Sequence, residues 1–251
     1  MTRLGHESAG LDEKTFLQEY PKQEYPKPSV TVDLVILTVL DTDLKVLLIR
    51  RKGHPYQGWW SLPGGFVDVG DVYKNQGESL DAAANRELAE ETGLPTGSVY
   101  LEQLYTFGNP GRDPRMRVLS VAYYALISSD KMAFVQAGDD AADAQWFSVS
   151  DWYPASPTEI PKLPFDHESI LHAAVDRIRG KIDYTPISFE LVPKTFTVPE
   201  LRAVYEAIKG ESYNPSNFRR RFQRMLTDGI IKEAPGKRTT RTRPAKVYRF
   251  S

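Results

Sequence analysis

Residues 86–94 carry three glutamates at a spacing that suits metal chemistry, within the run Arg-Glu-Leu-Ala-Glu-Glu-Thr-Gly-Leu. On an α-helix, Glu87, Glu90 and Glu91 share the apolar side. The opposite, polar side is expected to carry Asp81, Asn85, Ala89 and Thr92. Carboxylates that face a protein body repel one another and lose hydration, so they need a compensating positive charge. Since Mg²⁺ prefers carboxylate oxygens, the spacing predicts a metal site. The alternative is a helix with solvated acids, in which Arg86 pairs with Glu90 four positions later.

A longer pattern includes these acids, because Glu78 precedes Arg86 by eight positions. The resulting Glu-x7-Arg-Glu-Leu-x-Glu-Glu-x-Gly-Leu resembles the Nudix box, the motif of hydrolases that act on a nucleoside diphosphate linked to another group. Six residues match at fixed spacing: Glu78, Arg86, Glu87, Glu90, Glu91 and Gly93.

The box departs from the family pattern ahead of its first glutamate. The family has a glycine six positions before that glutamate, where this chain has Val72. We take Gly65, in Leu-Pro-Gly-Gly-Phe, as the counterpart, which implies a seven-residue insertion between Gly65 and Glu78. Asp71 would keep the spacing to Gly65 but would break the spacing to Arg86. The insertion leaves the metal helix intact and makes the loop geometry, and therefore the rate, the open question.

The resemblance implies roles for the box residues. Glu87, Glu90 and Glu91 would ligate Mg²⁺ or Mn²⁺, Arg86 would orient Glu87, and Glu78 would support the metal or its water. Bound metal would neutralise the substrate's diphosphate and acidify an attacking water. The predicted catalytic set is thus Glu78, Arg86, Glu87, Glu90 and Glu91, and the expected substrate is a nucleotide sugar, with ADP-ribose giving AMP and ribose 5-phosphate.

Arginines and glycines near the expected strand ends are candidates for substrate binding, because arginine forks suit phosphate oxygens. The predicted substrate-binding residues are Arg50, Arg51, Gly64, Gly65, Arg112 and Arg115. An ordinary exposed basic loop remains the alternative for residues 109–115. Three further acids, Asp139, Asp140 and Asp143, could add a metal ligand or belong to a solvated loop.

Composition restricts the class of protein. The 251 residues are 41% hydrophobic and 26% charged, which suits one large folded domain or two ordinary ones. The absence of cysteine excludes disulfides and thiolate metal sites. No leader pattern or membrane-length apolar run occurs, so we expect a cytoplasmic protein that does not bind membranes.

Charge is unevenly distributed along the chain. The net charge is −1, yet residues 194–251 hold 14 Lys and Arg against 5 acids, a net of +9 that leaves −10 for the remainder. This asymmetry indicates an acidic catalytic body joined to a part that meets a polyanion.

The polar residues 1–28 repeat Gln-Glu-Tyr-Pro-Lys and read as an N-terminal arm with no readable role. Strands are expected near 30–39, 44–50, 99–107, 117–127 and 144–149. A helix is expected at 79–92, with Ser79 as its N-cap, and another at 167–179. We therefore predict an α/β fold, a Nudix α/β/α sandwich with a mixed sheet, in a domain at 29–160.

Residues 161–251 are predicted to form a winged helix-turn-helix domain that binds double-stranded DNA. Thr197 and Glu200 form a capping box that opens a helix ending at Gly210, and Asn214 with Pro215 begins a second helix that ends at Asp228 and Gly229. A basic hairpin tip is expected at 236–243. The predicted DNA-binding residues are Arg219, Arg220, Arg221, Arg224, Lys237, Arg238, Arg241 and Arg243. A solvated basic surface is the alternative.

Both halves together resemble the Nudix-related transcriptional regulators of bacterial NAD metabolism. The resemblance covers residues 30–251, and its telling residues outside the box include Arg112-Asp113, Phe165-Asp166-His167 and Phe218-Arg219-Arg220-Arg221. It implies a homodimer that hydrolyses ADP-ribose and binds DNA. Two alternatives stay open: a ligand-responsive repressor without catalysis, and a plain Nudix hydrolase whose basic domain mediates assembly.

Overall fold

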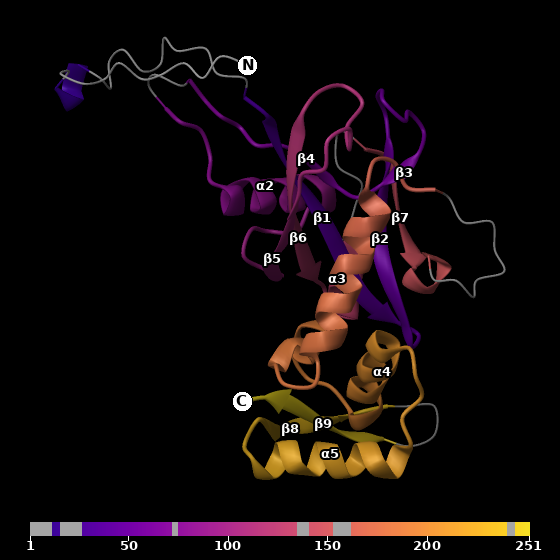
Figure 1. Ribbon diagram of the computed structural model, residues 1–251. Coiled ribbons are helices and arrows are strands. Elements are labelled where there is room, and N and C mark those ends of the chain that lie inside the picture. Colours follow the sequence, from indigo (N-terminus) through magenta and orange to yellow (C-terminus); the bar gives the residue numbers. More distant parts are fainter. Residues whose placement is uncertain (1–11, 16–26, 72–74, 135–140, 153–161, 240–243) are drawn as a thin grey trace.

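The computed structural model describes residues 12–15, 27–71, 75–134, 141–152, 162–239 and 244–251 (Figure 1). The predicted DNA-binding residues Arg241 and Arg243, the arm at 1–11 and 16–26, and Asp139 and Asp140 fall outside these ranges. The N-terminal part contains β1 (Ser29–Leu40), β2 (Asp43–Arg51), β3 (Trp60–Ser61), β4 (Gly64–Phe66), α2 (Leu80–Thr92), β5 (Tyr100–Phe107), β6 (Val118–Leu126), η2 (Ser129–Phe134), β7 (Ala141–Ser148) and η3 (Val149–Trp152). The C-terminal part contains α3 (His167–Lys181), η4 (Pro186–Leu191), α4 (Val198–Lys209), α5 (Pro215–Thr227), β8 (Ile231–Arg238) and β9 (Ala245–Phe250).

A seven-stranded mixed sheet forms the N-terminal part. Its main path runs β3-β2-β1-β6-β5, with β4 paired to β1 and β7 paired to β2. The central pair β1 and β6 is parallel, from Ser29 opposite Val118 to Leu37 opposite Leu126, and the other pairs are antiparallel. Because β4 pairs with β1, Gly64 and Gly65 are held against the central strand of the sheet.

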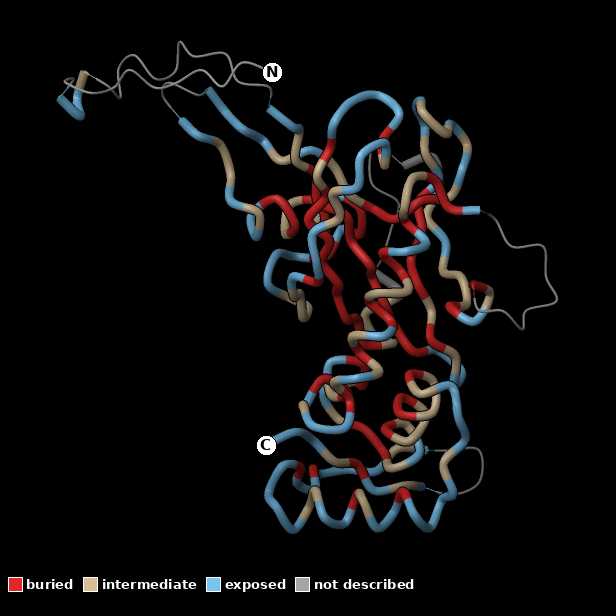
Figure 2. Tube along the Cα trace, in the orientation of Figure 1, coloured by how far each residue is buried: buried red, intermediate tan, exposed pale blue. Residues whose placement is uncertain are grey.

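Strand β1 shows why helices cover both faces of this sheet. Successive side chains of a strand point to opposite faces. Accordingly, Val32, Leu34 and Ile36 pack in the cluster that contains Ala83, Ala84 and Leu88 of α2. The intervening Val35 and Leu37 pack in the cluster that contains residues of α3. Buried residues fill the sheet and the helix faces turned to it (Figure 2), so the predicted α/β/α sandwich is confirmed.

Helix α2 has the predicted ends. The Ser79 side chain accepts a hydrogen bond from the Ala82 amide, and Gly93 adopts a left-handed conformation that ends the helix. One expectation was wrong: Thr92 is fully buried instead of lying on the polar side. Its hydroxyl donates to the Leu88 carbonyl and accepts from the Leu94 amide, because the chain turns back at Gly93 and covers it.

The C-terminal part has the predicted winged-helix arrangement of two helices and a hairpin. The capping box of Thr197 and Glu200 is present at the start of α4, and Asn214 accepts from two amides at the start of α5. Strand β8 runs to Arg238 with an irregularity between Ala234 and Lys237, so the hairpin tip begins later than predicted. The reason is that Pro235 and Gly236 form a bulge, which interrupts pairing without ending the strand.

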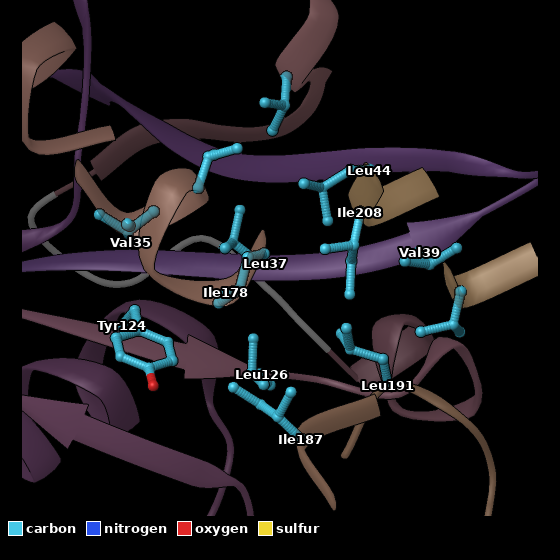
Figure 3. Close-up of a cluster of buried hydrophobic side chains, with 14 of the residues drawn as sticks. Val35, Leu37, Val39, Leu44, Tyr124, Leu126, Ile178, Ile187, Leu191 and Ile208 are labelled. Carbon is cyan, nitrogen blue, oxygen red and sulfur yellow. The ribbon is translucent and has the colours of Figure 1, made fainter. Parts of the chain in front are cut away.

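One apolar cluster joins the two parts. It contains Leu37 and Leu126 from the sheet, Ile178 from α3, Leu191 from η4 and Ile208 from α4 (Figure 3). The winged helix is therefore packed on the sandwich through a shared core, in which α4 contacts both α3 and the sheet (Figure 1).

Replacing Ile178 by alanine tests this shared core. Ile178 is fully buried, so Ile178→Ala should lower the free energy of unfolding by about 2–5 kcal/mol through lost burial and a residual cavity. Chemical denaturation measures the difference. The matched control is Ile230→Ala, whose side chain is 40% exposed and whose loss should cost much less. Equal effects of the two substitutions would contradict a common core at the junction.

Candidate functional site

Arg86 is the centre of the box and contacts all the acids expected to surround it except Glu91. Its Nε and Nη2 donate to both carboxylate oxygens of Glu78, at 3.1 and 2.6 Å. Its Nη1 donates to Glu87 at 2.7 Å and to Glu90 at 3.1 Å. A further bond reaches the Phe66 carbonyl at 3.2 Å. The hydrogen bond from Arg86 lowers the pKa of Glu78, so this pair is ionised and fixes the start of α2 to the loop after β4.

The seven-residue insertion is closed at its base. The Glu78 amide donates to the Asp68 carbonyl at 2.9 Å, and the Asp68 amide donates back to the Glu78 carboxylate at 3.0 Å. Gly77 permits this contact, since a Cβ there would lie 1.9 Å from the Asp68 carbonyl oxygen. The chain therefore leaves the box at Asp68 and returns to it at Glu78, and Glu78 keeps its ion pair with Arg86.

Glu87 lies directly against the backbone of β4. A Cβ added at Gly65 would be 2.2 Å from Oε1 of Glu87, so any larger residue there would push this carboxylate out of its present position. Burial raises the pKa of Glu87, against the lowering effect of Arg86. Glu91 is also buried, at 5% exposure, whereas the Glu90 side chain is 57% exposed. The prediction that all three acids share the apolar side is therefore confirmed for Glu87 and Glu91 and wrong for Glu90, which turns to solvent and pairs with Arg86 four positions earlier.

Carboxylates are the ligands that a hard divalent cation prefers, but the carboxylates of the box do not lie around one common position. Among the residues that the structure describes, no group of three or more acids or histidines lies close enough to hold a metal ion. Arg86 accounts for this, because it draws Glu87 and Glu90 toward itself. Glu87 is a buried carboxylate next to Gly65, and burial raises its pKa. A cation bound beside it would stabilise its charged form.

Gly65→Ala should disturb this site without unfolding the protein. The added methyl group must displace the Glu87 carboxylate, and a displacement of about 1 Å in a catalytic group can cost about 10²-fold in rate. We expect a loss of nucleotide-sugar hydrolysis of that order, measured by steady-state kinetics. Gly53→Ala is the matched control, because nothing lies within 4 Å of a Cβ there. Full activity of Gly65→Ala would remove Glu87 from the proposed chemistry.

A cavity of about 170 Å³ opens beside the box and collects most of the predicted substrate-binding residues. Gly64, Gly65, Arg51, Arg112 and Arg115 all line it. Arg50 does not: it is exposed, and its Nε donates to the Gly58 carbonyl. Arg51 and Arg115 have aromatic partners, since their guanidinium groups lie 5.1 Å from the Phe165 ring and 5.4 Å from the Phe66 ring. Burial lowers the pKa of Arg51, as expected for a cation in a partly enclosed site.

The cavity floor contains a buried polar network that we did not predict. Arg112, with 4% of its side chain exposed, donates to both oxygens of Asp166 at 2.9 and 2.6 Å and to Asp33 at 3.2 Å. Nδ1 of His167 accepts from the Leu62 amide, and burial lowers the pKa of this imidazole. His167 is therefore neutral with its hydrogen on Nε2, and this nitrogen lies 3.6 Å from Oδ1 of Asp33. We name these four residues, Asp33, Arg112, Asp166 and His167, the Arg112 network.

The predicted DNA-binding residues divide into two groups. Arg219, Arg220 and Arg224 are exposed on α5, whose outer side is open to solvent (Figure 2), and Lys237 is exposed on β8. Arg221 and Arg238 are held by the protein instead, Arg221 by Asp183 at 3.1 Å and Arg238 by Glu200 at 2.5 Å. The exposed group forms a basic face that suits phosphate and base contacts.

A mixed sheet between two helices, with a complete acidic box at one side and a winged helix packed below, defines a nucleotide-acting sandwich joined to a DNA-binding unit. Comparisons with known proteins agree with this class. The NUDIX domain family matches residues 30–172, and the NrtR DNA-binding winged helix domain family matches residues 188–250. The chain belongs to the NrtR-like members of the Nudix family.

Three relatives describe this family further. An "ADPR responsive transcriptional repressor NtrR" of Acinetobacter baylyi is 37% identical over 239 residues, which cover 95% of this chain and 88% of that protein. An ADP-ribose pyrophosphatase of Methanocaldococcus jannaschii is 37% identical over 147 residues, which cover 59% of this chain and 73% of that protein. The crystal structure of Shewanella oneidensis NrtR complexed with a 27mer DNA is 34% identical, with a TM-score of 0.71, and the match covers 88% of this chain and 93% of that chain.

The described residues contain no helix that is both long enough and apolar enough to cross a membrane.

Proposed function

We propose that this protein is an ADP-ribose-responsive transcriptional repressor that also hydrolyses its effector. ADP-ribose would bind at the cavity beside the box, and double-stranded DNA would bind the exposed basic face of α5 and the β8–β9 hairpin. The similarity to an ADPR responsive repressor over nearly the whole chain supports the effector and the response. The similarity to an ADP-ribose pyrophosphatase supports the reaction.

In this proposal, Glu87, Glu90 and Glu91 hold Mg²⁺ or Mn²⁺, which supplies neutralisation of the diphosphate and a more acidic water. Glu78 keeps Arg86 in place, and Arg86 directs Glu87. Arg51 and Arg115 bind the diphosphate or ribose end of ADP-ribose, while Gly64 and Gly65 let the substrate approach the backbone. The products are AMP and ribose 5-phosphate.

One observation carries the catalytic part of the proposal. The mutual hydrogen bonds of Asp68 and Glu78 close the insertion, so the ion pair of Glu78 and Arg86 keeps a length of 2.6 Å. Arg86, fixed in this way, also donates to the Phe66 carbonyl and holds the acidic helix against β4. The insertion is not, on this ground, a reason for lost activity.

A repressor that binds ADP-ribose without hydrolysing it is the second candidate. It is favoured by the bonds from Arg86 to both Glu87 and Glu90, which hold two of the three proposed metal ligands away from a common centre. Catalysis then requires Glu90, which is exposed and can rotate, to leave Arg86 when the cation binds.

A panel of nucleoside-diphosphate compounds, each assayed for turnover with Mg²⁺ and for release of a duplex from the neighbouring promoter, separates these functions. We expect ADP-ribose to be hydrolysed and to release DNA. Release of DNA without formation of AMP would indicate a sensor that does not hydrolyse its effector. Turnover without any DNA binding would indicate a plain hydrolase with an assembly domain.

We propose a homodimer, since the predicted operator contact is that of a winged-helix regulator, and a cytoplasmic location, where DNA and the effector meet. We also propose that the chain divides into an arm at 1–28, a Nudix domain at 29–160 and a winged-helix domain at 161–251. Helix α3 contacts β1 and β5 as well as α4, so it contributes to both halves.

A further inference from the structure

Helix α3 reaches from the proposed effector cavity to the winged helix (Figure 1). At its N-terminal end, Asp166 is the cap residue and His167 is the first residue of the helix, and both belong to the Arg112 network at the cavity. Along its length, Ile170, Leu171 and Ile178 are fully buried against the sheet. A ligand that moves the Arg112 network therefore acts directly on a rigid element whose far end lies at the DNA-binding half.

The C-terminal end of α3 is bound to α4 by hydrogen bonds from side chains to backbone carbonyls. Nε of Arg179 donates to the Ile208 carbonyl at 2.9 Å, and Nζ of Lys209 donates to the Arg179 carbonyl at 3.2 Å. The hydroxyl of Tyr205 donates to the Ile182 carbonyl at 3.3 Å. These bonds cross from one helix to the next, so α4 must follow a displacement of the end of α3.

Asp183, two residues after the end of α3, contacts both helices of the winged helix. Its carboxylate binds Lys209 of α4 at 2.5 Å and Arg221 of α5 at 3.1 Å. Both contacts lower the pKa of Asp183, Lys209 more strongly, so the group is ionised at neutral pH. The Arg221 guanidinium also lies 4.4 Å from the centre of the Tyr205 ring. We name Asp183, Tyr205, Lys209 and Arg221 the Asp183 clamp.

Arg221 occupies the turn of α5 that carries the exposed Arg219, Arg220 and Arg224. Because its own side chain points inward to the clamp, it fixes the rotation of α5 and thereby the direction in which those arginines project. A change at Asp183 would alter how the basic face is presented without removing any residue from that face.

The junction beside the clamp has room to move. A cavity of about 560 Å³ lies between the β1–β2 turn, η3 and the C-terminal end of α4, and Asp43, Ser150, Arg179, Lys209 and Gly210 are among its lining residues. Close-packed interiors resist displacement, whereas an open groove at a junction permits two arrangements of the parts that line it.

We propose that Asp183 is a positioning residue for DNA recognition, and that α3 couples it to the effector cavity through the Arg112 network at the other end of the helix. The inference rests on the proposed function, since it names how that effector controls DNA binding. Arg221 was predicted to bind DNA, and this inference instead gives it the role of holding α5 in position.

Linkage gives a direct test. If bound DNA changes the affinity for the effector, the effector changes the affinity for DNA by the same factor. The dissociation constant of a non-hydrolysable methylene analogue of ADP-ribose is measured by calorimetry with Mg²⁺, for the free full-length protein and for its complex with the promoter duplex. We expect the two constants of the natural protein to differ by about tenfold or more. For Asp183→Asn they should agree within about twofold, while the affinity of the free protein for the analogue is unchanged.

Asp176→Asn is the matched control, because Asp176 is an exposed acid on the same helix, outside the clamp. It should keep the natural ratio. Circular dichroism and thermal melting check that Asp183→Asn is folded; if it is not, Lys209→Gln removes the other half of the clamp and should give the same equal constants.

The proposal for Asp183 is overturned if folded Asp183→Asn shows the same ratio of the two dissociation constants as the natural protein. Lys209→Gln is judged in the same way when it replaces that variant, and in either case the proposed function stands. Equal constants in the natural protein overturn the effector response itself, and the inference with it.

Discussion

Glu87→Gln is expected to abolish ADP-ribose hydrolysis and to leave the protein folded. The substitution keeps the size of the side chain and its place beside Gly65, but it removes the charge that a divalent cation would bind and that Arg86 contacts at 2.7 Å. Loss of one charged catalytic group typically costs about 10²–10⁴-fold in rate. Release of AMP measured by chromatography gives kcat and KM separately, and we expect the loss mainly in kcat.

The control for this result is Asp81→Asn on the same helix. Asp81 is exposed and accepts a hydrogen bond from the Tyr123 hydroxyl at 2.7 Å, away from the box. Its substitution removes an equal charge and should leave turnover nearly unchanged. If Glu87→Gln hydrolysed ADP-ribose as fast as the natural protein, the assignment of the box chemistry would be wrong.

The second large effect concerns DNA. Arg220→Ala combined with Arg224→Ala removes two exposed cations from the outer side of α5. An arginine that reads a base edge contributes about 1–3 kcal/mol. Each lost phosphate contact reduces the slope of log affinity against log salt concentration by about 0.9. We expect promoter affinity to fall by at least about tenfold, with hydrolysis unchanged. Fluorescence anisotropy at several salt concentrations measures both quantities.

Arg117→Ala combined with Lys27→Ala is the matched control, since it removes two exposed cations outside the winged helix. This pair should retain most of the DNA affinity, because net charge acts over the whole surface whereas the contacts are local. Equal weakening by both pairs would mean that DNA attraction is only a matter of total charge. Arg221 is left out of the test, because its loss would also break the Asp183 clamp.

The elements that sequence predicted best are those whose signals are local. Ser79 and Gly93 mark the ends of α2, and the Thr197 capping box marks the start of α4, because the hydrogen bonds that fix these ends involve neighbours only a few positions away. Strand β1 was predicted at 30–39 and lies at Ser29–Leu40 for the same reason, since its apolar run is continuous.

What sequence did not predict depends on contacts between distant positions. Arg112 and Asp166 are 54 residues apart and Asp183 and Arg221 are 38 apart, so nothing in their local pattern announces a partner. Strands β3 and β4 are too short for a periodic signal, and β4 exists because β1 offers it a pairing edge. The extra aspartates illustrate the same limit: Asp143 lies within β7, not in the predicted loop, since residues 141–148 pair with β2.

The sequence also could not predict how the insertion is accommodated beside the box. Spacing alone left Asp71 as a competitor of Glu78 for the first position of the box. The ion pair of Glu78 with Arg86 and its bonds to Asp68 settle which acid occupies the box geometry, and they depend on the left-handed conformation of Gly77, with a φ of 81°. Backbone closure of this kind is not encoded in composition or spacing.

A single time course tests the central claim that one protein senses ADP-ribose, releases DNA and destroys the effector. Anisotropy of a labelled promoter duplex is followed in Mg²⁺ after a pulse of ADP-ribose, with AMP sampled in parallel. We predict a fall in anisotropy followed by recovery as AMP accumulates. A fall that never recovers would contradict hydrolysis, and an unchanged signal would contradict the coupling of the two halves.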